Sequence, residues 1–137
     1  GYNIIFAWEE LSSLAKSDLN AARCRLMDIL CNYQALCKMY LILVFDAYRV
    51  KGNPGSVERY HNIDVVYTKA ETADQYIEKV THEMSRKNHR VRVATSDGLE
   101  QIIIMGAGAI RVSARELLEE IRAAEKEMRE SFDISVE

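Results

Sequence analysis

Acidic side chains stand at three separate points of the chain where a regular element begins or ends. Asp46 directly follows the apolar run at residues 41–45, and Asp97 follows the β-branched segment at residues 91–95. Asp74 lies at the start of a helical pattern. Carboxylates that crowd together repel one another unless a cation neutralises them, and hard divalent ions prefer such oxygen ligands. If the three acids meet in space, they form a site for Mg²⁺ or Mn²⁺.

A divalent ion held by carboxylates can carry out one well-defined kind of chemistry. It polarises a phosphodiester, generates a hydroxide nucleophile near neutral pH and stabilises the leaving oxygen. Hydrolysis of a phosphodiester is therefore the reaction class that the pattern favours, with Asp46, Asp74 and Asp97 as its catalytic and metal-binding acids.

Each acid also has a simpler interpretation. The helix dipole alone favours an acid in a first helical turn, such as Asp74. Asp97 can cap a helix together with Glu100, and Asp46 can be a turn residue at a strand end. The coincidence of three acids that one fold would bring together favours chemistry, because helix caps do not require it.

Strand and helix patterns alternate along the chain, and this alternation determines where the acids lie. Strands are predicted at residues 3–6, 41–45, 63–67, 91–95 and 110–112, and residues 47–62 are predicted to be an irregular loop. Four helices are predicted. The first begins after the N-cap Asp18, and the second runs from a capping box at residues 72–75 to about residue 87. The third covers residues 99–105, and the fourth begins with a second capping box at residues 113–116. The alternation indicates an α/β fold of three layers, α/β/α, with a mainly parallel sheet.

Ligands of a parallel α/β sheet bind outside the carboxyl ends of the strands, where loops from several strands meet. The three aspartates and Glu71 are all predicted near such ends. Four basic residues are candidates to contact an anionic backbone near this edge, or are solvated surface charges: Arg23, Arg49, Lys51 and Arg59. Two tyrosines of the predicted loop either stack on bases or pack the loop down: Tyr48 and Tyr60.

The bulk composition sets wider bounds. With 137 residues, of which 48% are hydrophobic, the chain has the size of one domain with a real core. Its net charge of −3 arises in residues 113–137, which hold eight acidic and four basic residues, so charge neither supports nor excludes RNA binding. No apolar run has the length of a bilayer span, and the first residues lack the features of a secretory signal. No membrane partner and a cytoplasmic location are therefore the default expectations.

Several short segments, taken together and in order, resemble the YacP-type NYN domains over nearly the whole chain, so residues 1–137 are interpreted as a single NYN domain. These segments are Gly1-Tyr2-Asn3-Ile4-Ile5, Val44-Phe45-Asp46-Ala47-Tyr48, residues 67–74, Thr95-Ser96-Asp97-Gly98 with Gln101, and Ser113-Ala114-Arg115-Glu116-Leu117. The resemblance implies a PIN-like nuclease fold and a divalent-metal endoribonuclease activity. In characterised relatives it also implies cleavage of messenger RNA in association with translating ribosomes.

The resemblance also implies roles for single residues. Asp74 and Asp97 would be metal-binding acids and Asp46 a further acidic member of the site. Polar residues that would line the site are Asn3 and Ser96. Residues that would contact the substrate are Arg49, Lys51 and Gln101.

One departure from the family pattern concerns the beginning of the chain. Relatives usually carry an aspartate immediately before the glycine of the Gly-Tyr-Asn run, at the end of a full first strand, and this sequence starts at that glycine. We therefore expect the strand at residues 3–6 to be the end of a truncated first strand. A hydrophobic strand ending in aspartate before Gly1 in the native gene product would strengthen the nuclease interpretation.

Three hypotheses follow for the function. The first is a metal-dependent endoribonuclease that uses Mg²⁺ or Mn²⁺ to cleave single-stranded RNA, with messenger RNA on the ribosome as the substrate that the resemblance implies. The second is a catalytically silent module of the same fold that binds RNA or the ribosome. The third is another metal-dependent phosphohydrolase, which acts on DNA or on small phosphate esters. The sequence does not determine the oligomeric state.

Overall fold

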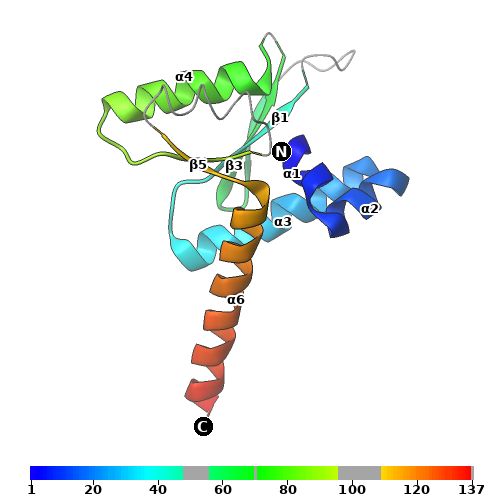
Figure 1. Cartoon of the computed structure of the whole chain (residues 1–137), viewed down its shortest axis with the longest axis vertical. Helices are drawn as coiled ribbons and strands as arrows, with labels where there is room; N and C mark the ends of the chain where they lie inside the picture. The colour runs from blue at the N-terminus through cyan, green and yellow to red at the C-terminus, as the bar shows by residue number, and fades with distance from the viewer. Residues whose placement is uncertain (48–55, 70, 96–108, 137) are drawn as a thin grey trace.

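The structure, a computed structural model, describes residues 1–47, 56–69, 71–95 and 109–136, with the backbone alone for residues 131–136 (Figure 1). The helices are α1 Tyr2–Ala7, α2 Glu9–Ser17, α3 Leu19–Cys37, α4 Ala73–Arg86 and α6 Ala114–Val136. The strands are β1 Ile42–Asp46, β2 Ser56–Tyr60, β3 Ile63–Thr68, β4 Arg92–Ala94 and β5 Ile110–Val112. The chain therefore has the mixed α/β fold that the alternating patterns predicted.

The described strands form two small sheets. In one, β3 lies between β1, which runs parallel to it, and β2, which runs antiparallel. In the other, β4 and β5 form a parallel pair. The strand pairing is thus mixed, so the predicted mainly parallel sheet is only partly supported. The three-layer arrangement stays a prediction.

The antiparallel strand β2 corrects one prediction, because it occupies the second part of the segment that was predicted to be an irregular loop. Tyr60 pairs with Ile63 across a two-residue turn, in which His61 takes a positive φ of 51°. Turns of this kind usually carry glycine or asparagine at the positions of positive φ. The residue before Asn62 is a histidine, so the usual signal of a hairpin is weak here.

The first residues are a second correction, because they form helix α1 and not a strand. Ile4 and Ile5 are both buried. A short apolar run does not distinguish a buried strand from a buried helix turn, and this explains the wrong prediction. Helix α2, which buries Leu11, follows without having been predicted.

The remaining predictions of elements in the described residues are confirmed. Asp18 caps α3 by accepting a hydrogen bond of 3.0 Å from the backbone N–H of Ala21. Thr72 and Gln75 form the predicted capping box of α4. The predicted strands at residues 41–45, 63–67, 91–95 and 110–112 correspond to β1, β3, β4 and β5. The predicted helix at residues 99–105 lies outside the described residues.

The main core lies between the sheet and helices α1, α2, α3 and α6. Leu43, Phe45 and Val65 point into it, together with buried residues of these helices. Because side chains alternate along a strand, Val44 and Val66 face the opposite side of the sheet. Helix α4 contacts β1 and β3 and is drawn above the strands in Figure 1, away from α3.

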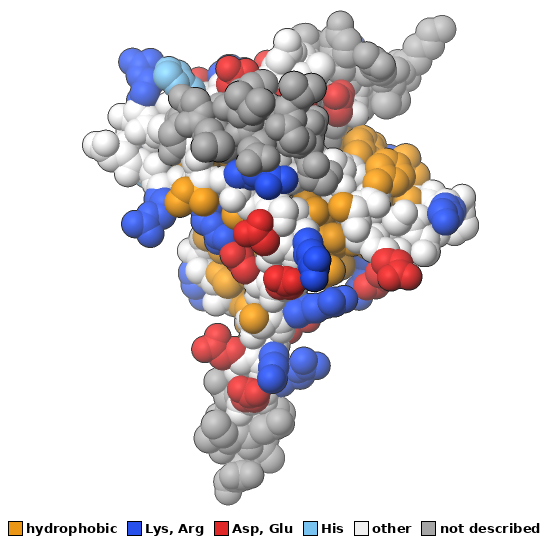
Figure 2. All heavy atoms as spheres, in the orientation of Figure 1, with side chains coloured by type: hydrophobic (Ala, Val, Ile, Leu, Met, Phe, Trp, Pro, Cys, Tyr) orange, Lys and Arg blue, Asp and Glu red, His pale blue; other side chains and the backbone are white. Residues whose placement is uncertain are grey.

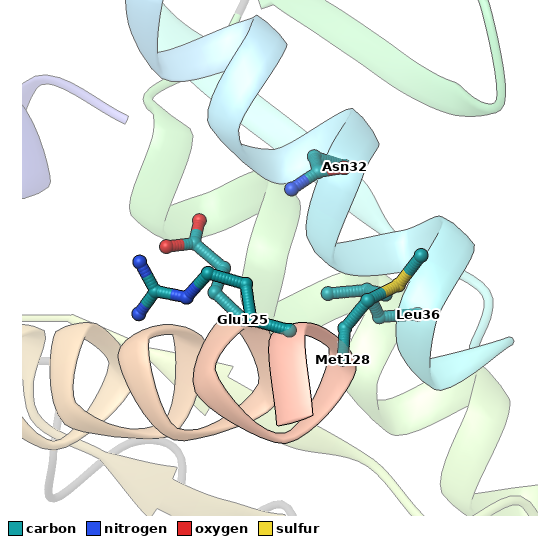
Figure 3. Close-up of a pocket in the computed structure, with 5 residues that line it drawn as sticks. Asn32, Leu36, Glu125 and Met128 are labelled. Atoms are coloured by element: carbon teal, nitrogen blue, oxygen red, sulfur yellow. The ribbon is translucent and has the colours of Figure 1, made fainter. Parts of the chain in front are cut away.

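Helix α6 is anchored at its first turn and extends away from the sheet toward the C-terminus (Figure 1). The indole Nε1 of buried Trp8 donates a hydrogen bond of 2.7 Å to the carbonyl of Ala114. Further along, α6 and α3 border a shallow groove of about 290 Å³ (Figure 3). It is lined by Asn32, Leu36, Glu125, Met128 and Arg129. Among the described helices, none is long and apolar enough to cross a membrane.

The second predicted capping box, at the start of α6, has a testable pH dependence. The Ser113 hydroxyl accepts from the N–H of Glu116, and the Glu116 carboxylate accepts from the N–H of Ser113 at 3.3 Å. These bonds with Ser113 lower the pKa of Glu116. A lowered pKa in the folded state adds stability above the unfolded pKa of about 4.3, and this stability is lost as pH falls through the folded pKa.

We therefore expect the melting temperature of the wild type to fall more steeply with acidification than that of Glu116→Gln, which keeps the backbone bond but does not titrate. The measurement is thermal unfolding by circular dichroism, from neutral pH down to about pH 3. Parallel curves for the two proteins would show that the Glu116 carboxylate has no lowered pKa.

Candidate functional site

The carboxyl ends of β1 and β3 place two of the predicted acids at one edge of the sheet. In the parallel pairing, Asp46 is in register with Thr68, the last residue of β3. The chain then enters α4, whose first turn carries Asp74, and α4 contacts both β1 and β3. Asp46 is exposed and Asp74 is half-buried. Both carboxylates therefore belong to the edge where ligands of α/β sheets bind.

The beginning of α1 connects this edge to the end of β4. The backbone N–H of Gly1 donates to the carbonyl of Val44, in β1, at 2.7 Å. The amide Nδ2 of Asn3 donates to the hydroxyl Oγ1 of Thr95 at 2.9 Å. Thr95 is almost fully buried, at 1% exposure, and its N–H donates to the carbonyl of Val112. Asn3, predicted to line the site, is thus the side chain that ties α1 to the residue after β4.

No local sequence pattern predicts that Thr95 pairs with Asn3. Its partner Asn3 is 92 residues away in the chain. Thr95 is nevertheless informative, because it lies two residues before the predicted ligand Asp97 in the sequence. The buried hydroxyl fixes the point from which the chain continues toward Asp97.

Most of the remaining predicted site residues lie outside the described part of the chain. They are Arg49, Lys51, Ser96, Asp97 and Gln101. Within residues 1–47, 56–69, 71–95 and 109–136, no group of three or more His, Cys, Asp or Glu side chains is placed to hold a metal ion. The three-acid site therefore stays a prediction, of which two members, Asp46 and Asp74, are described.

The chemistry of these two donors fits a small hard cation. Mg²⁺ keeps several waters and is usually bound through one or two carboxylates together with phosphate oxygens of the substrate. Asp46 and Asp74 offer carboxylate oxygens at an accessible edge. Glu71, at the same edge, forms an ion pair of 3.2 Å with Lys79.

Arg59 is a correction to the predicted set of basic residues near this edge. Its guanidinium forms an ion pair of 2.9 Å with Asp64, near the amino end of β3. Hydrogen bonds from the hydroxyl of Tyr40 and from Arg59 hold the pKa of Asp64 below its ordinary value. Asp64 lies four residues before Thr68, about 13 Å along an extended strand. Arg59 is thus at the opposite end of the sheet from the acids.

The ambiguous role of Tyr60 is settled in the same region. Its hydroxyl donates a bond of 2.7 Å to Asp28 on α3, and its ring makes an edge contact with His61. The hydrogen bond to Asp28 raises the pKa of Tyr60 to about 12. Tyr60 therefore packs the β2–β3 hairpin onto α3, and it is not a stacking platform for bases at the acidic edge.

The surface charges are interspersed on the face shown in Figure 2. Acidic and basic side chains lie among one another there, and the described side chains of that face form no extended basic surface.

The whole chain, residues 1–137, matches the family model described as the YacP-like NYN domain. The chain belongs to this family. It is 41% identical over 127 residues to the uncharacterized protein YacP of Bacillus subtilis (strain 168), covering 92% of this chain and 74% of that protein. The membership confirms the resemblance carried by the short motifs.

Solved structures agree with the family assignment. A crystal structure of a mutant of Rae1 (YacP) from Bacillus subtilis matches with a TM-score of 0.84 and 37% identity, over 100% of this chain and 81% of that one. A second crystal structure of Rae1 (YacP) matches with a TM-score of 0.80 and 38% identity, over 98% of this chain and 78% of that one. YacP-like NYN domains are PIN-like, and NYN domains are generally nucleases, so the family supports an RNA-related nuclease function.

Proposed function

We propose that this chain is a divalent-metal-dependent endoribonuclease that cleaves single-stranded RNA. Membership of the YacP-like NYN family supports a nuclease in general. The observation that carries the proposal for this chain is the placement of Asp46 and Asp74 at the shared carboxyl edge of β1 and β3. In the proposed site Asp97 completes the acidic set, within a three-layer PIN-like arrangement.

In this proposal the residues of the chain bind the metal ion and orient the RNA, and the metal ion would act as the Lewis acid. Asp74 and Asp97 hold Mg²⁺ or Mn²⁺, and Asp46 adds a third negative charge. When bound there, such an ion would supply Lewis-acid chemistry, polarising the phosphodiester and stabilising the leaving oxygen. The bond between Asn3 and Thr95 holds the end of β4 against α1. Residues proposed to contact the substrate are Arg49, Lys51, Ser96 and Gln101.

The proposed natural substrate is messenger RNA, met on the ribosome in the cytoplasm. This part of the proposal comes from the resemblance to YacP-type NYN domains and needs no residue beyond those of the acidic edge. A test is the position of cuts in messenger RNA that is being translated, compared with the same RNA free of ribosomes. Cuts that depend on translation would support this part of the proposal, and equal cleavage of both RNAs would overturn it.

The core experiment offers three substrates side by side: a labelled single-stranded RNA, a DNA of the same sequence and a small phosphate ester. With Mg²⁺ or Mn²⁺ we expect internal cuts in the RNA alone, and none in the presence of EDTA. Turnover of the DNA or the ester at a similar rate would point to another phosphohydrolase. RNA that is bound but stays intact would identify a silent binding module.

A further inference from the structure

Arg23 is held in place by neutral partners among the described residues. It lies half-buried on α3, where its Nη1 donates to the hydroxyl of Tyr2 at 3.1 Å and its Nη2 donates to Oδ1 of Asn20 at 3.0 Å. Both acceptors are neutral. Arg23 forms no ion pair with a carboxylate of the described residues, whereas Arg25, two positions further on, forms an ion pair of 3.3 Å with Glu10.

A row of three aromatic rings connects Arg23 to the carboxyl edge of the sheet. The ring of Tyr2 packs on Phe45 with centroids 5.0 Å apart, and Phe45 stacks on Tyr67 at 5.5 Å. Burial and then the charge of Glu58 raise the pKa of Tyr67, and the charge of Arg23 opposes that rise. The charge of the Arg23 guanidinium thus affects Tyr67, which lies near the carboxyl end of β3.

The row and the acids share one edge but face opposite sides of the sheet. Phe45 and Tyr67 are register partners and come one residue before Asp46 and Thr68. Because successive side chains of a strand alternate, Asp46 faces the α4 side and the rings face the α3 side. A strand of RNA that crosses the edge at the acids would therefore pass onto the side of the sheet where Arg23 lies.

We propose that Arg23, oriented by the hydroxyl of Tyr2, binds a backbone phosphate of the RNA on the α3 side of the sheet edge. The inference rests on the proposed function, because it assigns a second contact to the same substrate. A guanidinium has five N–H donors, and the bonds to Tyr2 and Asn20 leave donors for phosphate oxygens. A planar, permanently charged fork matches the geometry of a phosphate.

The test is RNA binding without cleavage. Fluorescence anisotropy in EDTA measures the Kd of a short single-stranded RNA at several KCl concentrations, for wild type, Arg23→Gln and Arg25→Gln. We expect Arg23→Gln to weaken binding about tenfold at low salt, since a charge-assisted contact is lost. The slope of log Kd against log salt should fall by about 0.7, the value for one phosphate on a single strand. Arg25→Gln, the matched control, should change neither.

Two further variants separate charge from orientation. Arg23→Lys should keep the salt slope and lose part of the affinity, because a lysine ammonium is a point charge without the fork. Tyr2→Phe should weaken binding with the slope unchanged, because it removes only the oxygen that orients Arg23. Circular dichroism checks that each variant is folded. If Arg23→Gln unfolds, the affinity of Arg23→Lys decides: weaker binding supports the phosphate contact, and wild-type affinity overturns it.

The outcomes also separate this inference from the proposed function. Metal-dependent RNA cleavage by the wild type, together with identical RNA binding by Arg23→Gln and Arg25→Gln, would overturn the role of Arg23 and leave the nuclease intact. Binding that depends on Arg23, with no cleavage under any metal, would overturn the nuclease and leave the phosphate contact in place.

Discussion

Replacement of Asp74 by asparagine is expected to lower the rate of metal-dependent RNA cleavage by about a hundredfold or more, since loss of groups that only support metal ligands already costs 10- to 100-fold. Asparagine is nearly the same size and cannot neutralise the ion. If Asp74 served only the dipole of α4, the same change would cost about 0.3–1 kcal/mol of stability and leave cleavage unchanged.

The measurement is single-turnover cleavage of a labelled RNA at saturating Mg²⁺, with the melting temperature recorded in parallel. Asp97→Asn should behave like Asp74→Asn. The matched control is Asp28→Asn, since Asp28 is exposed on α3 and asparagine can still accept the bond from Tyr60. Full activity of Asp74→Asn with a small loss of stability would assign Asp74 to helix capping alone.

Replacement of Phe45 by alanine is expected to lower the free energy of unfolding by about 3–5 kcal/mol, the usual cost of truncating a buried aromatic side chain. Phe45 is fully buried and contacts the rings of Tyr2 and Tyr67. A methyl group built on Gly1 would lie only 2.5 Å from its ring, so the beginning of α1 packs directly on Phe45. The cavity would therefore loosen α1 at the place where it meets the candidate site.

Urea unfolding, followed by circular dichroism, measures this loss. The matched control is Phe6→Ala, because Phe6 carries the same side chain on α1 but is 60% exposed. It should change the free energy of unfolding by no more than about 0.5 kcal/mol. Equal losses for the two variants would show that Phe45 is not the buried centre of this region.

The elements that could be predicted from the sequence are those with local signals. Helix α3 has an apolar period and a capping aspartate, Asp18, and α4 and α6 begin with capping boxes. Strand β1 corresponds to the continuous apolar run at residues 41–45, and β3 is rich in β-branched residues. These signals act within a few residues, so they can be recognised before any tertiary contact is known.

The elements that were missed or wrongly predicted depend on tertiary contacts. Residues 2–7 form a helix because Ile4 and Ile5 pack into the core beside α3 and α6, and the short run alone fits a strand equally well. Strand β2 exposes most of its side chains and therefore shows no alternation of apolar and polar residues. Its pairing with β3 keeps it in the extended conformation. In both cases the partner decides the conformation, and the local pattern does not.

The candidate site divides in the same way. Acids at strand ends can be found in the sequence, because a parallel sheet brings the carboxyl ends of its strands to one edge. Two contacts cannot be found in the sequence, because each joins residues far apart in the chain. They are the bond between Asn3 and Thr95 and the bond between Arg23 and Tyr2. The predicted position of Arg59 near the acids was wrong for the same reason. The pairing of β2 with β3 places Arg59 beside Asp64, and this pairing cannot be predicted from the local sequence.

The central claim is that Asp46, Asp74 and Asp97 share one divalent ion. The most direct measurement is an anomalous difference map from crystals of this chain grown with Mn²⁺. We expect one peak at the carboxyl edge of β1 and β3, bonded directly or through one water to each of the three carboxylates. A peak elsewhere, or acids too far apart to share an ion even through water, would contradict it.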